Sequence, residues 1–284
     1  MKVGMMFSNV MFFGRPEGAD ALAKGAEESG LESLWTVEHV VVPAGYESPY
    51  PYSPTGKMPG GETAPIPDPL AWIAYMAAIT ETVRLATGIL ILPQRNPVVL
   101  AKEAATIDVL SGGRLTLGVG IGWLAEEFDA IGVPFGERVG RTEEYMEALR
   151  ALWSDDETFD GSFTRFSGAR SFPKPVQDGG IPLVVGGHTK AAARRAGRLG
   201  DGFFPARADN MADLVDECRR AAKDAGRDPD AIEITVGGIG DVDYAKRMAD
   251  LGVKRIVVPP PSFAPDDIGR ALGDLHDNFI AKVI

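Results

Sequence analysis

The sequence predicts an α/β fold, a (β/α)8 TIM barrel, on three observations. Short apolar, β-branched runs alternate with helical patterns, several of these runs follow a glycine-containing turn, and 284 residues is a usual length for eight such units. A doubly wound open sheet is the alternative. We expect a single domain over residues 1–284, with insertions at about 40–67 and 120–181, after the second and fourth strands.

The eight expected strands do not alternate cleanly between polar and apolar residues, as is typical of parallel strands covered on both faces. They are Lys2–Phe7, Glu32–Val37, Arg84–Leu90, Arg114–Gly118, Pro182–Val185, Asp201–Phe204, Ile232–Val236 and Lys254–Val258.

Helix signals lie between these strands. Asp68 and Asn96 each stand before a proline, which predicts an N-cap followed by Pro at the first helical position. Glycines in SGLESLW, SGGRLTL, LGDGFF and LGVKRIVV are expected to end helices in the left-handed conformation. The second insertion is expected to hold a helix over about Glu137–Trp153 and a hairpin turning at Asp160–Gly161.

Composition excludes several classes of function. The formal net charge of −11 argues against binding nucleic acid or an anionic membrane. Cys218 is the only cysteine, and with three histidines a metal site built from Cys or His is not expected. No apolar run reaches the length of a membrane span, and Ser8 and Asn9 interrupt the apolar N-terminus, so we expect a buried first strand and a cytoplasmic protein.

The catalytic and binding residues of such a barrel lie at the carboxyl ends of its strands. The second strand ends in Glu38 and His39; His39 either faces the mouth, where it can donate a hydrogen bond or a proton, or is satisfied by the adjacent Glu38. Trp123, after the fourth strand, lines either a pocket or the core. Arg95 is expected to be solvated, although it could pair with an anion, and Glu126–Glu127 is interpreted as helix-surface charge.

The fifth strand ends in Gly186–Gly187, and a helix is expected to begin near Thr189. Free N–H groups at a helix N-terminus form an anion site. The helix carries Lys190, Arg194, Arg195 and Arg198, which are expected to be mostly solvated while favouring an anionic ligand nearby. Pro205 and Arg207, after the sixth strand, either border the same pocket or form a plain turn.

Residues 43–69 hold 8 of the 21 prolines and three of the six tyrosines. This segment follows the second strand and is either a wall of the site or a passive insertion, and we favour the wall. Tyr46, Tyr50 and Tyr52 are its aromatic residues. No G-x-S-x-G motif is present and Cys218 lies in a helical pattern, so we expect a cofactor to supply the reactivity.

Four segments carry a resemblance to the luciferase-like monooxygenase family, most closely to its branch that uses the deazaflavin coenzyme F420. They are SGLESLWTVEHVVVP (29–43), RLATGILILPQRNPVVLAKEAATIDVLSGGRLTLGVGIGW (84–123), EEFDAIGVPFGERVGRTEEYMEALRALW (126–153) and PLVVGGHTKAAARRAGRLGDGFFP (182–205). The resemblance implies a TIM barrel with a planar coenzyme standing at the carboxyl-terminal mouth, and a homodimer.

The resemblance also assigns roles to residues. His39 matches the residue beside the deazaflavin ring and is the expected proton donor. Gly88–Ile89 matches a strand-three bulge, often with a non-proline cis peptide, that supports the ring. The remaining matches are Gly120 and Gly122 in the strand-four turn beside the coenzyme, and Gly186, Gly187 and Thr189 in the phosphate-binding turn.

One residue departs from the family's sugar-phosphate dehydrogenase. Trp123 stands where that enzyme has a catalytic acid, which favours a more apolar substrate, with Trp123, Tyr46 and Tyr50 as the expected pocket residues. The resulting hypothesis is an F420-dependent oxidoreductase that transfers a hydride to or from a small organic molecule. The alternatives are an FMN-dependent two-component monooxygenase, a non-catalytic flavin- or deazaflavin-binding protein, and a cofactor-free hydrolase or isomerase.

Overall fold

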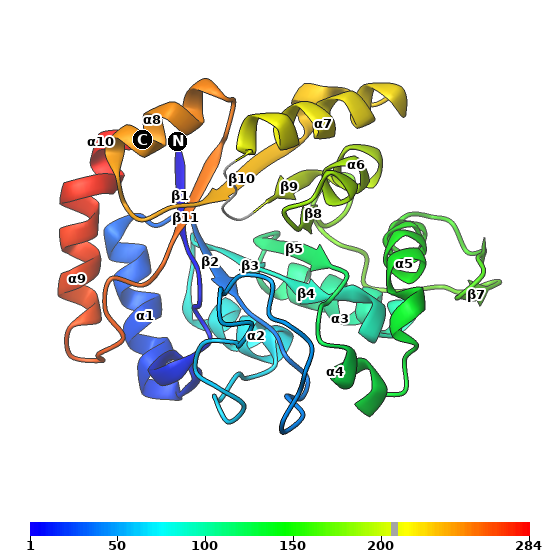
Figure 1. Cartoon of the computed structure of the whole chain (residues 1–284), viewed down its shortest axis with the longest axis horizontal. Helices are drawn as coiled ribbons and strands as arrows, with labels where there is room; N and C mark the ends of the chain where they lie inside the picture. The colour runs from blue at the N-terminus through cyan, green and yellow to red at the C-terminus, as the bar shows by residue number, and fades with distance from the viewer. Residues whose placement is uncertain (206–209) are drawn as a thin grey trace.

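The eight expected strands form a closed parallel barrel surrounded by helices (Figure 1). The structure is a computed structural model that describes residues 1–205 and 210–284. Going around the barrel, the strands follow the order β3-β2-β1-β11-β10-β9-β8-β5, and the pairing of β3 with β5 closes it. This topology confirms the predicted TIM barrel and excludes the open sheet.

The strands lie within or next to the predicted runs. They are β1 Lys2–Met5, β2 Ser33–Thr36, β3 Arg84–Thr87, β4 Leu90–Ile91, β5 Leu115–Gly120, β6 Phe159–Asp160, β7 Arg165–Phe166, β8 Leu183–Gly186, β9 Gly202–Phe204, β10 Glu233–Gly237 and β11 Arg255–Val258. Strands β6 and β7 form a separate antiparallel hairpin in the second insertion.

The helices lie outside the barrel, with α1 and α9 packed side by side (Figure 1). They are α1 Pro16–Ser29, α2 Pro69–Ile79, α3 Pro97–Leu110, α4 Ala125–Ala130, α5 Arg138–Trp153, α6 Lys190–Leu199, α7 Met211–Asp224, α8 Val242–Asp250, α9 Ile268–Leu275 and α10 Ala281–Val283. Both predicted N-caps form, because Asp68 accepts the N–H groups of Leu70 and Ala71, and Asn96 caps α3 in the same way. Within the described residues, no helix is both long and apolar enough to cross a membrane.

The third predicted strand is interrupted. The peptide bond between Gly88 and Ile89 is cis, as the resemblance implied, and it separates β3 from the two-residue β4. Strand β4 still pairs with β5, with Leu90 opposite Val119. The chain therefore continues parallel to β5 after the interruption.

Two apolar layers hold the barrel together. Inside it, Trp35, Ala86, Val184, Phe204 and Val257 form a compact buried cluster. Outside it, a larger cluster fills the space between the strands and the helices. Because side chains from several strands fill the interior, the barrel is a packed core rather than a pore, and ligands can enter only at an end.

Two local predictions were wrong. Gly200 adopts an extended conformation, with φ −88°, rather than a left-handed one. It is packed tightly, since a Cβ there would lie 2.9 Å from the carbonyl oxygen of Gly202. The hairpin does not turn at Asp160–Gly161 alone, because Asp160 pairs with Arg165 and four residues, 161–164, form the loop. Gly30, at the end of α1, is left-handed as predicted.

Candidate functional site

His39 lies just beyond the carboxyl end of β2, and its side chain is 9% exposed. Its Nδ1 lies 3.1 Å from Oε2 of Glu127, a residue of α4 that is fully buried. The ring also meets Trp123 edge to face, with centroids 5.6 Å apart. His39 is therefore held at the mouth by a residue of the helix that follows β5, and its partner is not Glu38.

The interpretation of Glu126–Glu127 as surface charge was wrong. Oε1 of Glu127 accepts the backbone N–H groups of Val40 and Val41, while Oε1 of Glu126 accepts those of Glu47 and Ser48. Hydrogen bonds from Ser48 and the backbone lower the pKa of Glu126 to about 2. The two carboxylates tie α4 to the segment 37–68; the helix and this segment both lie in the lower part of Figure 1.

Arg95 is not solvated, so that expectation was also wrong. It pairs with Glu38, and its Nη2 lies 2.9 Å from Asp68 Oδ2. Glu38 also accepts the N–H of Ile91. Burial raises the pKa of Glu38, against the opposing attraction of Arg95. These contacts join the ends of β2 and β4 to the N-cap of α2, so Arg95 is already occupied within the protein.

The glycines expected beside a coenzyme pack against the protein itself. A Cβ on Gly120 would lie 1.7 Å from Cδ1 of Ile89, and one on Gly186 would lie 2.8 Å from Cγ2 of the same residue. Gly122 is left-handed, with φ +77°, and a Cβ there would lie 2.7 Å from Phe128. Ile89 is half-buried and lies between the ends of β5 and β8, so the absence of side chains at these glycines makes room for it.

A chain of aromatic rings crosses the mouth from the end of β2 to the end of β8. In order, its members are His39, Trp123, Tyr50, Tyr52 and His188, each with its ring centroid 5.1–5.6 Å from the next. Tyr46 also contacts Trp123, but it is 3% exposed and its hydroxyl accepts the N–H of Met58. Tyr46 therefore belongs to the internal core of the segment, whereas Tyr50 and Tyr52 extend across the mouth.

The turn after β8 leads directly into the N-terminus of α6. Gly187 has φ +123°, and its N–H donates to the carbonyl of Phe204 on β9. Thr189 is the N-cap of α6, and its hydroxyl accepts the N–H of Ala192. The earlier N–H groups of α6 point toward the turn, where the helix dipole favours negative charge.

The basic run on α6 is largely neutralised. Arg195 and Arg198 both pair with Glu143 of α5, at 3.2 and 2.8 Å, and Arg194 pairs with Glu217 of α7. Lys190, in the first turn, is exposed and forms no ion pair with the described residues. The expectation of a mostly solvated helix face holds for Arg194 and Arg198, which stay about half exposed although paired, and fails for Arg195, which is buried. Among the four basic residues of this helix, Lys190 is the one without an ion pair in the described residues.

Some buried polar atoms lack a hydrogen-bond partner in the described part of the chain. They belong to Gln94, Glu126, Arg138 and His188. Each of these residues follows the carboxyl end of a strand: Gln94 follows β4, Glu126 and Arg138 follow β5, and His188 follows β8. Because buried polar atoms are normally satisfied, such groups indicate where a bound molecule or water supplies the partner. Gln94 and His188 closely follow strands that end at the mouth, whereas Arg138 begins α5, beyond α4.

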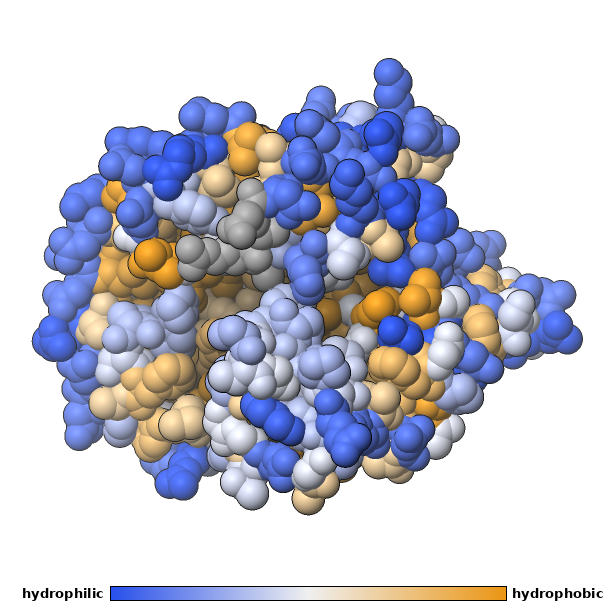
Figure 2. Space-filling model, in the orientation of Figure 1, coloured by the Kyte–Doolittle hydropathy of each residue, from blue (hydrophilic) through white to orange (hydrophobic). Residues whose placement is uncertain are grey.

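The surface agrees with this location. Figure 2 shows that the middle of the face is hollowed beside the segment 37–68, with apolar side chains in the hollow and hydrophilic ones around it. A concave, mostly apolar site with a few polar groups is the usual form of a cofactor site.

Comparison with known proteins places this geometry in a family. The sequence model of the luciferase-like monooxygenases matches residues 6–244. The chain belongs to this family. The protein Rv0953c of Mycobacterium tuberculosis, which is uncharacterised, is 34% identical over 255 residues, covering 87% of this chain and 88% of the relative.

Two further members are informative. The F420-dependent glucose-6-phosphate dehydrogenase of Nocardia farcinica is 35% identical over 231 residues, covering 78% of this chain and 63% of that one. Among solved structures, the monooxygenase RslO1 from Streptomyces bottropensis covers the whole of both chains, with a TM-score of 0.76 and 24% identity. The latter likeness shows the shared fold.

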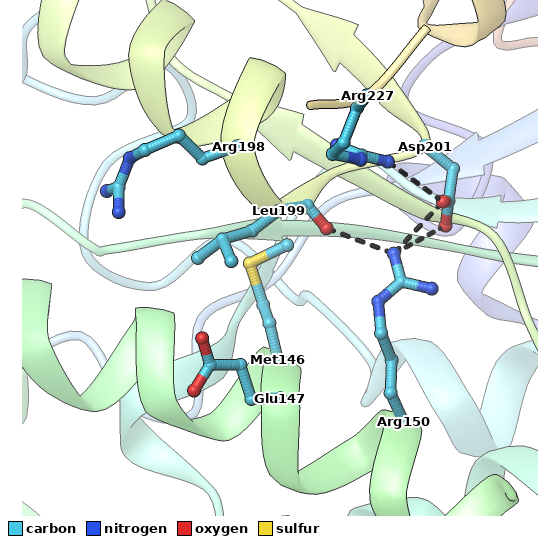
Figure 3. Close-up of a pocket in the computed structure, with 7 residues that line it drawn as sticks. All are labelled: Met146, Glu147, Arg150, Arg198, Leu199, Asp201 and Arg227. Atoms are coloured by element: carbon cyan, nitrogen blue, oxygen red, sulfur yellow. Dashed lines mark hydrogen bonds and ion pairs between the residues drawn. The ribbon is translucent and has the colours of Figure 1, made fainter. Parts of the chain in front are cut away.

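One surface cavity of this family member lies away from the mouth. About 340 Å³ in volume, it is bordered by α5, the end of α6 and Asp201 (Figure 3). Figure 3 shows Arg150 and Arg227 directed at Asp201, which Arg150 contacts at 2.9 and 3.0 Å. Asp201 also accepts the N–H of Leu183. Since Asp201 precedes β9, this cluster joins elements at the amino-terminal end of the barrel and serves the fold.

Glu127 and His188 are the site residues that sequence reasoning missed. A signal for Glu127 was available, because Leu124, Glu127 and Phe128 have the i, i+3, i+4 spacing of one helix face, and all three are fully buried. His188 carried no comparable signal. Cys218 is buried, and burial raises its pKa to about 12, in agreement with a structural role. Arg207 lies outside the described residues.

Proposed function

We propose that this chain is an F420-dependent oxidoreductase that transfers a hydride between the deazaflavin and a small organic substrate. The observation that carries the proposal is that His39, bound to a carboxylate, lies at the same barrel mouth as three glycine-rich strand ends. The chain is also 35% identical to an enzyme named as F420-dependent. A homodimer, which rests on the resemblance alone, and a cytoplasmic location, which rests on the sequence pattern, are part of the same proposal.

The residues at the mouth fit such a coenzyme. The turn Gly186–Gly187 and the first N–H groups of α6 would hold its phosphate, with Thr189 fixing the start of the helix. The Gly88–Ile89 segment, with Gly120 and Gly122 nearby, would support the planar ring. Buried polar atoms without partners, His188 Nδ1 among them, are available to its polar groups.

Each part then has a chemical role. When bound, the deazaflavin supplies or accepts a hydride at one ring carbon. His39 would exchange a proton with the substrate beside it, since its ring is fixed at the mouth. The segment 37–68 would exclude water, because Tyr50 and Tyr52 extend across the mouth to His188.

Trp123 supports an apolar substrate. Its ring contacts His39, Tyr46 and Tyr50, so the wall next to the proposed proton donor is aromatic. The relative from Nocardia farcinica is named for glucose 6-phosphate. With Trp123 in place of an acid, we do not propose that substrate for this chain.

A second candidate is an FMN-dependent monooxygenase that works with a separate reductase. The name of the matching family, the luciferase-like monooxygenases, favours it. The same phosphate turn and ring support would serve FMN, so the two candidates differ in the coenzyme rather than in the location of the site.

Titrations with F420 and with FMN, followed by coenzyme fluorescence, separate the candidates. We expect F420 to bind and FMN to bind much more weakly; tight FMN binding without F420 binding would refute the proposal. Lys190→Ala should weaken coenzyme binding, and Lys24→Ala, which removes an exposed lysine of α1, is the matched control. Hydride exchange is then followed by the deazaflavin absorbance across a substrate panel, and binding with no exchange would indicate a non-catalytic binding protein.

A further inference from the structure

Glu127 is a buried carboxylate that is fully occupied by hydrogen bonds. Its Oε1 accepts the N–H of Val40 at 2.6 Å and that of Val41 at 3.3 Å. Its Oε2 faces Nδ1 of His39 at 3.1 Å. None of the Glu127 side chain is exposed, while 9% of the His39 side chain is.

This arrangement determines which ring nitrogen carries the hydrogen. A carboxylate only accepts hydrogen bonds, so Nδ1 of His39 must be the donor. In the neutral imidazole, Nε2 then has a free lone pair. Trp123 packs edge to face against the ring at an interplanar angle of 87°, and together with the Nδ1 hydrogen bond this contact restricts ring rotation.

We propose that Glu127 is the positioning residue for His39, holding it as the Nδ1–H tautomer so that Nε2 is the atom that exchanges a proton at the mouth. The functional part of this inference rests on the proposed function, in which His39 exchanges a proton with the substrate. When Nε2 takes up a proton, the resulting imidazolium faces the Glu127 carboxylate, which balances its charge in a buried setting. Glu127 acts only through His39.

The position of Glu127 in the fold suits this role. It lies in the first turn of α4, between Leu124 and Phe128, which are both fully buried. The same carboxylate binds the two residues that follow His39, so it fixes the backbone and the ring of the β2 end together. Neighbouring Glu126 binds the same segment further along and has no contact with His39.

Glu127→Gln should reverse the tautomer. The amide oxygen can still accept the N–H groups of Val40 and Val41, which leaves the amide NH₂ facing Nδ1. An NH₂ group donates, so Nδ1 must become the acceptor and the hydrogen moves to Nε2. In a Ser-His-Asp triad, the corresponding Asp→Asn change also yields the wrong tautomer and lowers kcat by about 10⁴-fold.

The test is nitrogen-15 NMR of histidine-labelled protein without coenzyme. The chain has three histidines, so the signals lost in His39→Ala assign His39. We expect Nδ1–H in the wild type, Nε2–H in Glu127→Gln, and the wild-type pattern in the matched control Glu126→Gln. Nε2–H in the wild type, or an unchanged tautomer in Glu127→Gln, would overturn the assignment.

Activity provides the second measurement. With a substrate found by the panel described above, Glu127→Gln should lower kcat by about 100-fold with little change in KM, because the proton exchange rather than binding is impaired. Unchanged kcat despite a reversed tautomer would overturn the functional role. Because the NMR measurement needs no coenzyme, its outcome does not depend on whether F420 or FMN is bound.

Discussion

Gly120→Ala tests whether Ile89 sets the shape of the mouth. The new Cβ would lie 1.7 Å from Cδ1 of Ile89, whereas carbon atoms in contact prefer about 3.5–4.0 Å. The methyl group must therefore move by about 2 Å. Overpacking of this kind costs about 1–3 kcal/mol. Ile89 is half-buried and its end can shift toward the open mouth, so we expect about 1–2 kcal/mol.

A compensating change makes the prediction specific. Ile89→Val removes Cδ1 and leaves Cγ1 as the nearest Ile89 atom, 3.1 Å from the added Cβ. Alone it should cost about 0.5–1.5 kcal/mol. In the double variant the clash is relieved. Its loss of unfolding free energy should therefore be smaller than the sum of the two single losses by about 1 kcal/mol.

Urea unfolding at pH 7 of the wild type, the two single variants and the double variant measures this coupling. Differential scanning calorimetry should show a loss of about 2–4 °C in Tm per kcal/mol. Additive costs in the double variant, or a Gly120→Ala protein as stable as the wild type, would refute the packing argument.

Three further predictions concern other parts of the chain. Glu126→Gln should destabilise the protein at neutral pH, and the difference in stability from the wild type should shrink as the pH falls from 4.5 to 2. The reason is that the hydrogen bonds that lower the pKa of Glu126 to about 2 stabilise the folded protein only while the carboxylate is ionised. Urea midpoints across this pH range measure the difference, and a constant difference would contradict the prediction. Cys218 should resist a thiol reagent at pH 8 until urea is added, since burial raises its pKa to about 12, and rapid labelling of the native protein would show an exposed thiol. Asp201→Asn should lower Tm by weakening the contact with Arg150 without changing coenzyme affinity, and altered affinity in the folded variant would show that the amino-terminal end of the barrel affects the mouth.

The regular part of the fold was readable from local sequence. Asp68 and Asn96 cap their helices as predicted, because an N-cap is decided by a side chain and the two or three N–H groups that follow it. The strands were readable because parallel strands covered on both faces need continuous apolar runs. Gly200 shows the limit: its conformation depends on the backbone of β9, so the rule for helix ends did not apply.

The charged residues were harder to interpret. Arg95 and the arginines of α6 were expected to be solvated, yet their carboxylate partners lie on other elements, as for Arg95 with Glu38 and Arg195 with Glu143. The net charge of the sequence is the same whichever residues form ion pairs, so it does not show which cations remain unpaired. Only the packing of one helix against another determines whether a cation remains available to a ligand.

By itself, the sequence determined the barrel, the order of its elements and the strand ends at which the proposed site lies, because these follow from periodicity, capping and turn chemistry within short stretches. The tertiary structure decided how those ends act on one another. His39 and Glu127 are 88 residues apart, and their contact forms only when the barrel closes and α4 packs beside the segment after β2. A hydrogen bond between strand ends has no local signature, because its geometry is set by the closure of the whole sheet.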